Sequence, residues 1–229
     1  MIEGVVFDKD GTLFDFRQSW GLWAARLLAE LARDDDHAAG MADALGYDQQ
    51  AQDFAPDSPV IAGTAEEIAA RLLPLLPHFS QSKLVDHLNL LAQSAVMSPA
   101  VPLRAVLGAL RARGLKLGLA TNDNEAPARA HLSAHGVLDL FDFVAGYNSG
   151  HGAKPGPGMC LAFASQTGID PEKAVMVGDS VHDLVAGRAA GMRVVAVLTG
   201  IAGAADLSPH ADAVLPNIGH LGAWIDSLA

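Results

Sequence analysis

Short apolar runs alternate with segments of helical spacing along most of the chain, and this alternation constrains the fold most strongly. The apolar runs lie at 4–7, 115–120, 143–145, 174–177, 194–198 and 213–215. Continuous runs of this kind are typical of parallel strands that are buried on both faces. The alternation therefore predicts an α/β, Rossmann-like parallel sheet, which binds ligands at the carboxyl ends of its strands.

The segment 17–97 interrupts this alternation and is expected to be helical. Apolar residues recur at helical spacing at Trp20, Trp23, Ala24, Leu27, Leu28 and Leu31, and again at Leu84, Leu88 and Leu91. The acidic run 34–36 is interpreted as a solvated helix end, and Thr64–Glu67 as a capping box that begins another helix. No strand is expected in this segment. We therefore predict a core of residues 1–16 and 98–229 with an inserted helical cap subdomain at 17–97.

Composition limits the partners and the compartment. Half of the 229 residues are hydrophobic, and 15 basic against 26 acidic residues give a net charge of −11. Acidic proteins are repelled by nucleic acid and anionic lipid, so neither is an expected partner. No stretch approaches the ~20 apolar residues of a membrane span, no signal peptide is seen, and the single cysteine cannot form an internal disulfide. A soluble cytoplasmic protein, monomer or homodimer, is expected.

Four polar clusters follow predicted strands or lie in nearby loops. They are 8–12 (Asp-Lys-Asp-Gly-Thr), 121–123 (Thr-Asn-Asp), 154–155 (Lys-Pro) and 178–183 (Gly-Asp-Ser-Val-His-Asp). In a doubly wound sheet these clusters converge at one edge. The sequence therefore predicts a single site at the carboxyl ends of the strands.

The carboxylates of the first and last clusters suit phosphoryl transfer. One of Asp8 and Asp10 can attack phosphorus while the other handles a proton. Asp179 and Asp183 add negative charge that a hard divalent cation with oxygen ligands, such as Mg2+, would neutralise. A purely structural interpretation stays open for each pair, because Asp-x-Asp-Gly can be a turn and Ser180-x-x-Asp183 can be a capping box.

The two middle clusters can hold a phosphoryl group. Lys154 supplies a point positive charge, and Thr121 and Asn122 precede a predicted helix, whose N-terminus favours anions. The chain contains neither a Walker loop nor a Gly-x-Ser-x-Gly elbow. Together the clusters predict Mg2+-assisted phosphoryl transfer to an aspartate.

In this order, the four clusters resemble the haloacid dehalogenase (HAD) superfamily of aspartate-nucleophile phosphatases. The run 183–192 (Asp-Leu-Val-Ala-Gly-Arg-Ala-Ala-Gly-Met) is most similar to the phosphoglycolate phosphatase-like branch. The resemblance implies a Mg2+-dependent phosphomonoester hydrolase with a helical cap. Its substrate is expected to be a small phosphorylated metabolite, with 2-phosphoglycolate as one candidate.

The resemblance also implies roles for individual residues. Asp8 is expected to be the nucleophile, and Asp10 the general acid for the leaving group and then the base for water. The expected metal ligands are Asp8, Asp10 through its backbone carbonyl, and Asp179, with Asp183 in support. The expected phosphate-binding residues are Gly11, Thr121, Asn122 and Lys154, with Gly11 and Asn122 contributing backbone donors.

Some residues depart from the pattern or are assigned to structure. Lys9 stands where the family commonly has an apolar residue, and either stabilises an anionic substrate or pairs with a neighbouring acid. The side chain of Asp123 is expected to point away from the phosphate, and Arg17 is a candidate contact for a substrate carboxylate. The residues expected to be structural or solvated are Trp20 and Trp23 in the cap core, His131 and His135 on one helix face, and His182 at the surface.

Three alternatives remain at this point. A phosphosugar mutase of the same superfamily keeps both Asp8 and Asp10, whereas dehalogenases and phosphonatases replace the second carboxylate. A phospho-accepting receiver-type signalling protein also has an acidic Mg2+ site and a lysine. A catalytically idle binding protein is the third.

Overall fold

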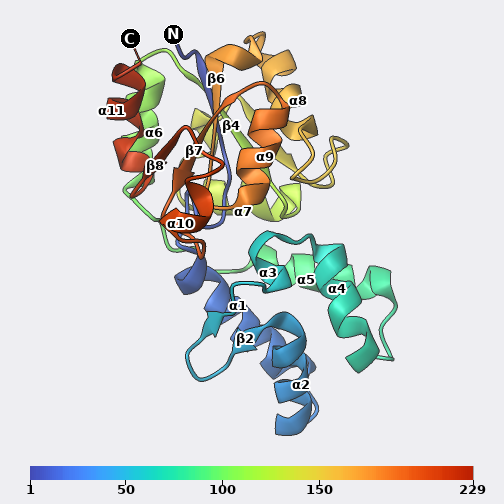
Figure 1. Cartoon of the computed structure of the whole chain (residues 1–229). Coiled ribbons are helices and arrows are strands. Elements are labelled where there is room, and N and C mark those ends of the chain that lie inside the picture. The colour runs from blue at the N-terminus through green and yellow to red at the C-terminus, as the bar shows by residue number, and fades with distance from the viewer. Residues whose placement is uncertain (229) are drawn as a thin grey trace.

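A computed structural model describes residues 1–228 and contains the predicted sheet (Figure 1). The six strands of this sheet are parallel, in the order β5-β4-β1-β6-β7-β8. Their bounds are β1 Gly4–Phe7, β4 Lys116–Thr121, β5 Phe143–Gly146, β6 Ala174–Gly178, β7 Arg193–Val197 and β8 Ala213–Leu215. The α/β, Rossmann-like fold is confirmed. The strand order changes direction between β1 and β6, and such switch points hold the ligands of these folds.

Strand β1 lies inside the sheet and explains why its sequence is apolar throughout. Phe7 pairs with Leu119 of β4 on one side and with Val177 of β6 on the other. Val5 and Phe7 belong to one hydrophobic cluster, and Val6 belongs to a second one. Side chains alternate between the two faces of a strand, so both faces of β1 are covered by packed side chains.

Helices cover the two faces of the sheet. The first cluster takes residues from α6 (Leu103–Ala112), α7 (Glu125–Ala134) and α11 (Leu221–Asp226). The second takes residues from α8 (Gly158–Thr167), α9 (Val181–Ala189) and α10 (Ala204–Leu207). Figure 1 shows α6 and α11 on one face of the sheet and α8 and α9 on the other. Short 3₁₀ turns occur at Leu73–Leu75, Leu138–Leu140, Pro171–Lys173 and Ile218–His220.

The segment between β1 and α6 is a helical insert beyond the carboxyl end of β1 (Figure 1). Its helices are α1 (Phe16–Leu31), α2 (Asp35–Leu45), α3 (Pro59–Ala62), α4 (Ala65–Leu72) and α5 (Gln81–Gln93). The two connections to the sheet lie side by side, because the Asp15 amide donates to the Ser98 carbonyl at 2.8 Å. The boundaries at 16/17 and 97/98 remain predictions. None of the described helices has the length and apolar character needed to cross a membrane.

Two expectations for the insert are wrong. It contains a small antiparallel pair, β2 (Tyr47–Asp48) with β3 (Asp53–Phe54), which is too short to give a periodic signal. The acidic run 34–36 begins helix α2 instead of ending α1. The Asp34 side chain accepts from the His37 amide, and Asp35 and Asp36 occupy the first helical turn. Carboxylates are favoured there by the positive end of the helix dipole.

Candidate active site

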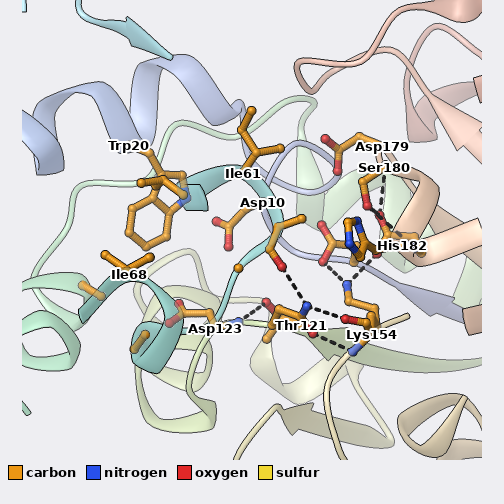
Figure 2. Close-up of a pocket in the computed structure, with 18 of the residues that line it drawn as sticks. Asp10, Trp20, Ile61, Ile68, Thr121, Asp123, Lys154, Asp179, Ser180 and His182 are labelled. Atoms are coloured by element: carbon orange, nitrogen blue, oxygen red, sulfur yellow. Dashed lines mark hydrogen bonds and ion pairs between the residues drawn. The ribbon is translucent and has the colours of Figure 1, made fainter. Parts of the chain in front are cut away.

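The four predicted clusters meet in one pocket, between the carboxyl ends of β1, β4 and β6 and the helical insert (Figure 2). We call the first side the strand-end wall, formed by Asp8, Asp10, Thr121, Lys154, Asp179 and Asp183. We call the other side the helical wall, formed by Trp20, Trp23, Ile61, Ile68, Leu88 and Asn89. The pocket therefore lies at the switch point of the sheet, where the sequence placed it.

Asp8 and Lys154 form the centre of the strand-end wall. The Asp8 amide donates to the Val177 carbonyl at 2.8 Å, which continues the β1–β6 ladder and fixes Asp8 directly at the strand end. The Lys154 Nζ donates to Asp8 Oδ1, to Asp183 Oδ1 at 2.6 Å and to the Ala120 carbonyl at 2.8 Å. Both side chains are buried, so Lys154 holds two carboxylates together out of water.

Three buried carboxylates of this wall could share a cation. Asp8, Asp179 and Asp183 each offer an oxygen, and these oxygens lie within 4.8 Å of one another. Burial raises the pKa of Asp8 to about 7, against the opposing effect of Lys154. Burial followed by repulsion from Asp8 and Asp183 holds the pKa of Asp179 well above its usual value. An excess of buried carboxylates over cations fits a hard divalent ion.

The structure arranges the expected metal ligands differently from the sequence prediction. The Asp183 carboxylate, expected only to support the site, lies as close as Asp8 and Asp179 do. It also completes the capping box, because its Oδ2 accepts from the Ser180 amide at 3.0 Å. The structural interpretation of this pair is therefore confirmed, and its part in a metal site stays a prediction. The side chain of Asp10 lies outside the triad, and coordination through its backbone carbonyl stays a prediction.

Gly11 shapes the turn beside Asp179. It has a φ of +81°, which L side chains rarely adopt, and a Cβ at this position would lie 2.3 Å from Asp179 Oδ2. Its amide donates to the Phe14 carbonyl at 2.8 Å. The donor that we expected on a phosphate is therefore used within the turn, and Gly11 instead gives Asp179 its room.

Asn122 and Thr121 reach the pocket in different ways. The Asn122 side chain accepts from the Lys154 amide at 2.8 Å and donates to the Lys154 carbonyl at 2.9 Å. It also donates to the Ala62 carbonyl of the insert at 2.8 Å, so the side chain positions Lys154, and a contact of the Asn122 backbone amide with a phosphate stays a prediction. The Thr121 hydroxyl accepts from the Asp123 amide at 3.0 Å, which leaves its own proton for an acceptor in the pocket.

Lys9 pairs with the neighbouring acid Asp10, which is one of the two roles expected for it, and it belongs to a larger cluster with Asp123 and His131 that the sequence analysis missed. Lys9 is fully buried, and its Nζ lies 2.8 Å from Asp123 Oδ2 and 3.1 Å from Asp10 Oδ2. Asp123 lines the pocket, but its carboxylate pairs with Lys9 and accepts from the Asn124 amide, so the expectation that it points away from the phosphate stays a prediction. His131, assigned to a helix face, lies 3.1 Å from the same Nζ. Burial alone would lower the pKa of Lys9, but Asp10 and Asp123 outweigh it and raise the pKa above its usual value.

Other side chains also differ from expectation. Arg17 is exposed, pairs with Asp53 at 2.9 Å and lines a separate groove, so its assignment to a substrate carboxylate is wrong. Trp20 and Trp23 belong to the hydrophobic core, as expected, but they also line the pocket, and their indole nitrogens are buried without a hydrogen bond of normal length. The sequence shows only apolar residues at helical spacing, and this pattern is the same for a helix that lines a pocket and for a helix that packs in a core. His182 is exposed, as expected, and also lines the pocket.

Known proteins that are similar to this chain identify its family. Residues 2–191 match the haloacid dehalogenase-like hydrolase family. A phosphoglycolate phosphatase of Rhodospirillum rubrum is 35% identical, over 98% of this chain and 91% of that protein. The chain belongs to the haloacid dehalogenase-like hydrolase family. The predicted resemblance is thereby confirmed, and this HAD-like protein is a hydrolase of the phosphatase kind.

Solved structures share the fold of this HAD-like hydrolase. A HAD phosphatase from Thermococcus onnurineus superimposes with a TM-score of 0.69 at 23% identity and covers 98% of both chains. A β-phosphoglucomutase from Clostridium difficile gives a TM-score of 0.68 at 20% identity, over 99% of this chain and 96% of the other. Because hydrolase and mutase share the architecture, fold similarity does not separate these activities.

Proposed function

We propose that this HAD-like hydrolase is a Mg2+-dependent phosphomonoester phosphatase that works through an aspartyl-phosphate intermediate on Asp8. The observation that carries the proposal is the buried group of Asp8, Lys154, Asp179 and Asp183 at the switch point of the sheet, with Asp10 on the same pocket. Family membership supports the same reaction class.

The chain's own residues account for both halves of the reaction. An Asp8 oxygen attacks phosphorus, the bond from phosphorus to the leaving oxygen breaks, and Asp10 gives its proton to that oxygen. Asp10 then takes a proton from a water molecule, which attacks the phosphoryl group, releases phosphate and restores Asp8. Lys154 and the Thr121 hydroxyl stabilise charge on the phosphoryl oxygens in both steps.

The metal site belongs to this proposal. Asp8, Asp179 and Asp183 would hold Mg2+, with the Asp10 carbonyl as a further ligand. When bound, the ion would neutralise the excess of buried carboxylates and the charge of the phosphoryl group. The raised pKa values of Asp8 and Asp179 express that same excess in the protein alone.

We assign the helical insert, residues 17–97, to a cap over the phosphate site. Its wall of the pocket is largely apolar, with Trp20, Trp23, Ile61 and Ile68 facing the strand ends. Such a wall excludes water from the reacting group. The Asn122–Ala62 hydrogen bond ties the insert to the loop of Lys154.

The helical wall also bears on the substrate. Among the described residues that line the pocket, neither lysine nor arginine comes from the insert. A phosphosugar mutase has to hold a second phosphate there, so this composition favours the hydrolase. The relatives named phosphoglycolate phosphatase make 2-phosphoglycolate a candidate substrate. Its carboxylate would find neutral donors at the indole N–H groups and Asn89.

Phosphate release from a panel of monoesters, with Mg2+ and with EDTA, tests the proposal. The panel contains 2-phosphoglycolate, ethyl phosphate, glycerol phosphate and glucose 1-phosphate. We expect stoichiometric alcohol and phosphate with Mg2+ and loss of release with EDTA. Isomerised phosphosugar without phosphate would contradict the hydrolase in favour of the mutase. A stable phosphoprotein without turnover would favour the receiver. Monomer or homodimer, and the cytoplasmic location, remain predictions.

A further inference from the structure

Lys9 has no role in the reaction above, although it separates the two aspartates Asp8 and Asp10. The side chain is fully buried and does not line the pocket. Burying a lysine is costly unless the charge is paired. The structure shows two carboxylates, an imidazole and an aromatic ring around this one ammonium group.

His131 is fixed as an acceptor toward Lys9. Its Nε2 lies 2.8 Å from the Ala92 carbonyl of helix α5. A carbonyl oxygen can only accept, so Nε2 carries the ring hydrogen and Nδ1 accepts from Lys9 Nζ at 3.1 Å. Burial followed by the nearby Lys9 charge lowers the pKa of His131 to about 4, so the ring is neutral at pH 7.

The Lys9 ammonium is therefore saturated. It has three protons and three acceptors, namely Asp10 Oδ2, Asp123 Oδ2 and His131 Nδ1. The ring of Trp20 covers it at 5.3 Å, a distance typical of a cation–π contact. No donor of Lys9 is left over for a ligand. Of the two roles expected for Lys9, direct stabilisation of an anionic substrate is therefore excluded, and pairing with a neighbouring acid remains.

The two oxygens of Asp10 are consequently not equivalent. Oδ2 pairs with Lys9 at 3.1 Å, whereas Oδ1 is buried and makes no hydrogen bond of normal length. Burial raises the pKa of Asp10, and the nearby Trp20 indole opposes this as a weak donor to the carboxylate. Asp10 lines the pocket, and Figure 2 shows it between Trp20 and Asp179. An unpartnered buried carboxylate oxygen is costly, and a substrate oxygen above Asp10 would satisfy it.

We propose that Lys9 is a positioning residue for Asp10: by anchoring Oδ2 it presents Oδ1 to the leaving oxygen of the substrate. This inference rests on the proposed phosphatase function. The proton moves from Asp10 Oδ1 to the leaving oxygen as the bond to phosphorus breaks. In the second half it returns to Oδ1 from the attacking water, and Lys9 keeps its three protons throughout.

The experiment compares two substrates that differ in their need for an acid. The leaving group of ethyl phosphate must be protonated, whereas that of 2,4-dinitrophenyl phosphate departs as a stable anion. General acid catalysis contributes about 10²–10⁴-fold. For Lys9→Met we expect kcat/KM to fall about 10- to 100-fold on ethyl phosphate and less than about 3-fold on 2,4-dinitrophenyl phosphate. If the Lys9 charge only stabilised the structure, its loss would lower kcat/KM on both substrates by the same factor.

Two controls sharpen the result. Lys173→Met removes a half-exposed lysine that pairs with Glu3, and should leave both values of kcat/KM unchanged. In an Asp10→Asn background, Lys9→Met should add little further loss on ethyl phosphate, because residues that act through one another are not additive. Equal losses on both substrates, or an undiminished loss in the Asp10→Asn background, would overturn the proposal.

A second variant covers a failure of Lys9→Met to fold, which thermal unfolding would reveal. Asp123→Asn keeps the shape of the cluster and removes the negative charge of one partner of Lys9, which weakens that anchor. It should show the same substrate dependence with a smaller loss, and a uniform loss would again contradict the proposal. If the unaltered enzyme with Mg2+ hydrolyses neither ester, the phosphatase function itself fails. An active enzyme with uniform losses refutes only the role of Lys9.

Discussion

The two walls of the pocket differ in which polar groups they leave without a hydrogen bond: an acceptor, Asp10 Oδ1, on the strand-end wall, and two donors on the helical wall. On the strand-end wall, Lys154 pairs with two carboxylates and Asn122 satisfies both backbone groups of Lys154. On the helical wall, the indole nitrogens of Trp20 and Trp23 are buried without partners. The first wall is preorganised for one chemical group, whereas the second leaves its donors free for the part of the substrate that varies. Changes to the first should therefore affect catalysis, and changes to the second should affect substrate choice.

The largest effect is expected for Asp8→Asn, which removes the nucleophile while keeping the shape of the strand-end wall. Loss of a nucleophile should lower kcat by roughly 10⁴-fold or more. Steady-state phosphate release with Mg2+ measures this effect, and thermal unfolding checks the fold. Asp139→Asn, at an exposed ion pair with Arg104, is the matched control and should retain full activity. Substantial Mg2+-dependent turnover by Asp8→Asn would rule out Asp8 as the nucleophile.

Lys154→Met is expected to affect both activity and stability. It leaves the carboxylates of Asp8 and Asp183 buried without their cation, and removal of one partner from such a cluster costs about 3–5 kcal/mol of unfolding free energy. Mg2+ binds the folded state, so it should raise the melting temperature of the variant more than that of the unaltered protein. Lys116→Met, at a half-exposed lysine, serves as the control. Equal Mg2+ responses in all three proteins would argue against a metal at these carboxylates.

His131 connects Lys9 to the Ala92 carbonyl of the insert and should give a pH-dependent effect on stability. Its pKa is about 4 in the folded protein, against an ordinary value of 6.5. Between these values the unfolded chain binds more protons, so stability rises with pH across this window and is lost as pH falls. The contribution reaches up to about 3 kcal/mol above pH 6.5.

The measurement is urea unfolding of the unaltered protein and of His131→Asn from pH 4.5 to pH 7. The carboxylates titrate in both proteins, so the difference between the two isolates the histidine. We expect this difference in unfolding free energy to narrow as the pH falls. A difference that stays constant with pH would mean that His131 is not buried as a neutral ring.

The smallest effect is expected on the helical wall. Trp23→Phe removes one unpartnered N–H donor, and a single neutral hydrogen bond contributes about 0.5–1.5 kcal/mol. KM for 2-phosphoglycolate should therefore rise about 2- to 10-fold with little change in kcat. KM for ethyl phosphate should not change. Trp224→Phe, on helix α11 away from the pocket, is the control. A fall in kcat on both substrates would contradict the assignment of substrate choice to the helical wall and of catalysis to the strand-end wall.

Local signals made the sheet and the strand-end wall predictable. Each strand is a short apolar run, and each site residue directly follows one or lies in an adjacent loop, so Asp8, Thr121 and Asp179 were found from position alone. The capping box at Ser180 and Asp183 was also visible in the spacing. Helix α2 was missed because an acidic run is compatible both with the solvated end of one helix and with the start of the next. The hydrogen bond from the His37 amide to Asp34 shows that the run begins α2.

The Lys9 cluster was not predictable because its contacts span long sequence separations. Lys9 meets Asp123 and His131 across 114 and 122 residues, and no local pattern relates them. One signal was present nonetheless. A lysine between two site aspartates at the end of a buried strand has to be paired with acceptors. The sequence showed that a partner was needed, and the structure shows which residues supply it.

The Asp179 carboxylate lies between two glycines, and this has a consequence for mutational tolerance. A Cβ at Gly11 would lie 2.3 Å from this carboxylate, and a Cβ at Gly200 only 1.7 Å from it. Neither glycine lines the pocket. In a library that randomises every position, both should nevertheless be as intolerant as the aspartates themselves. The positions that tolerate no substitution would then include two glycines whose only contribution is the space that they leave for the Asp179 carboxylate.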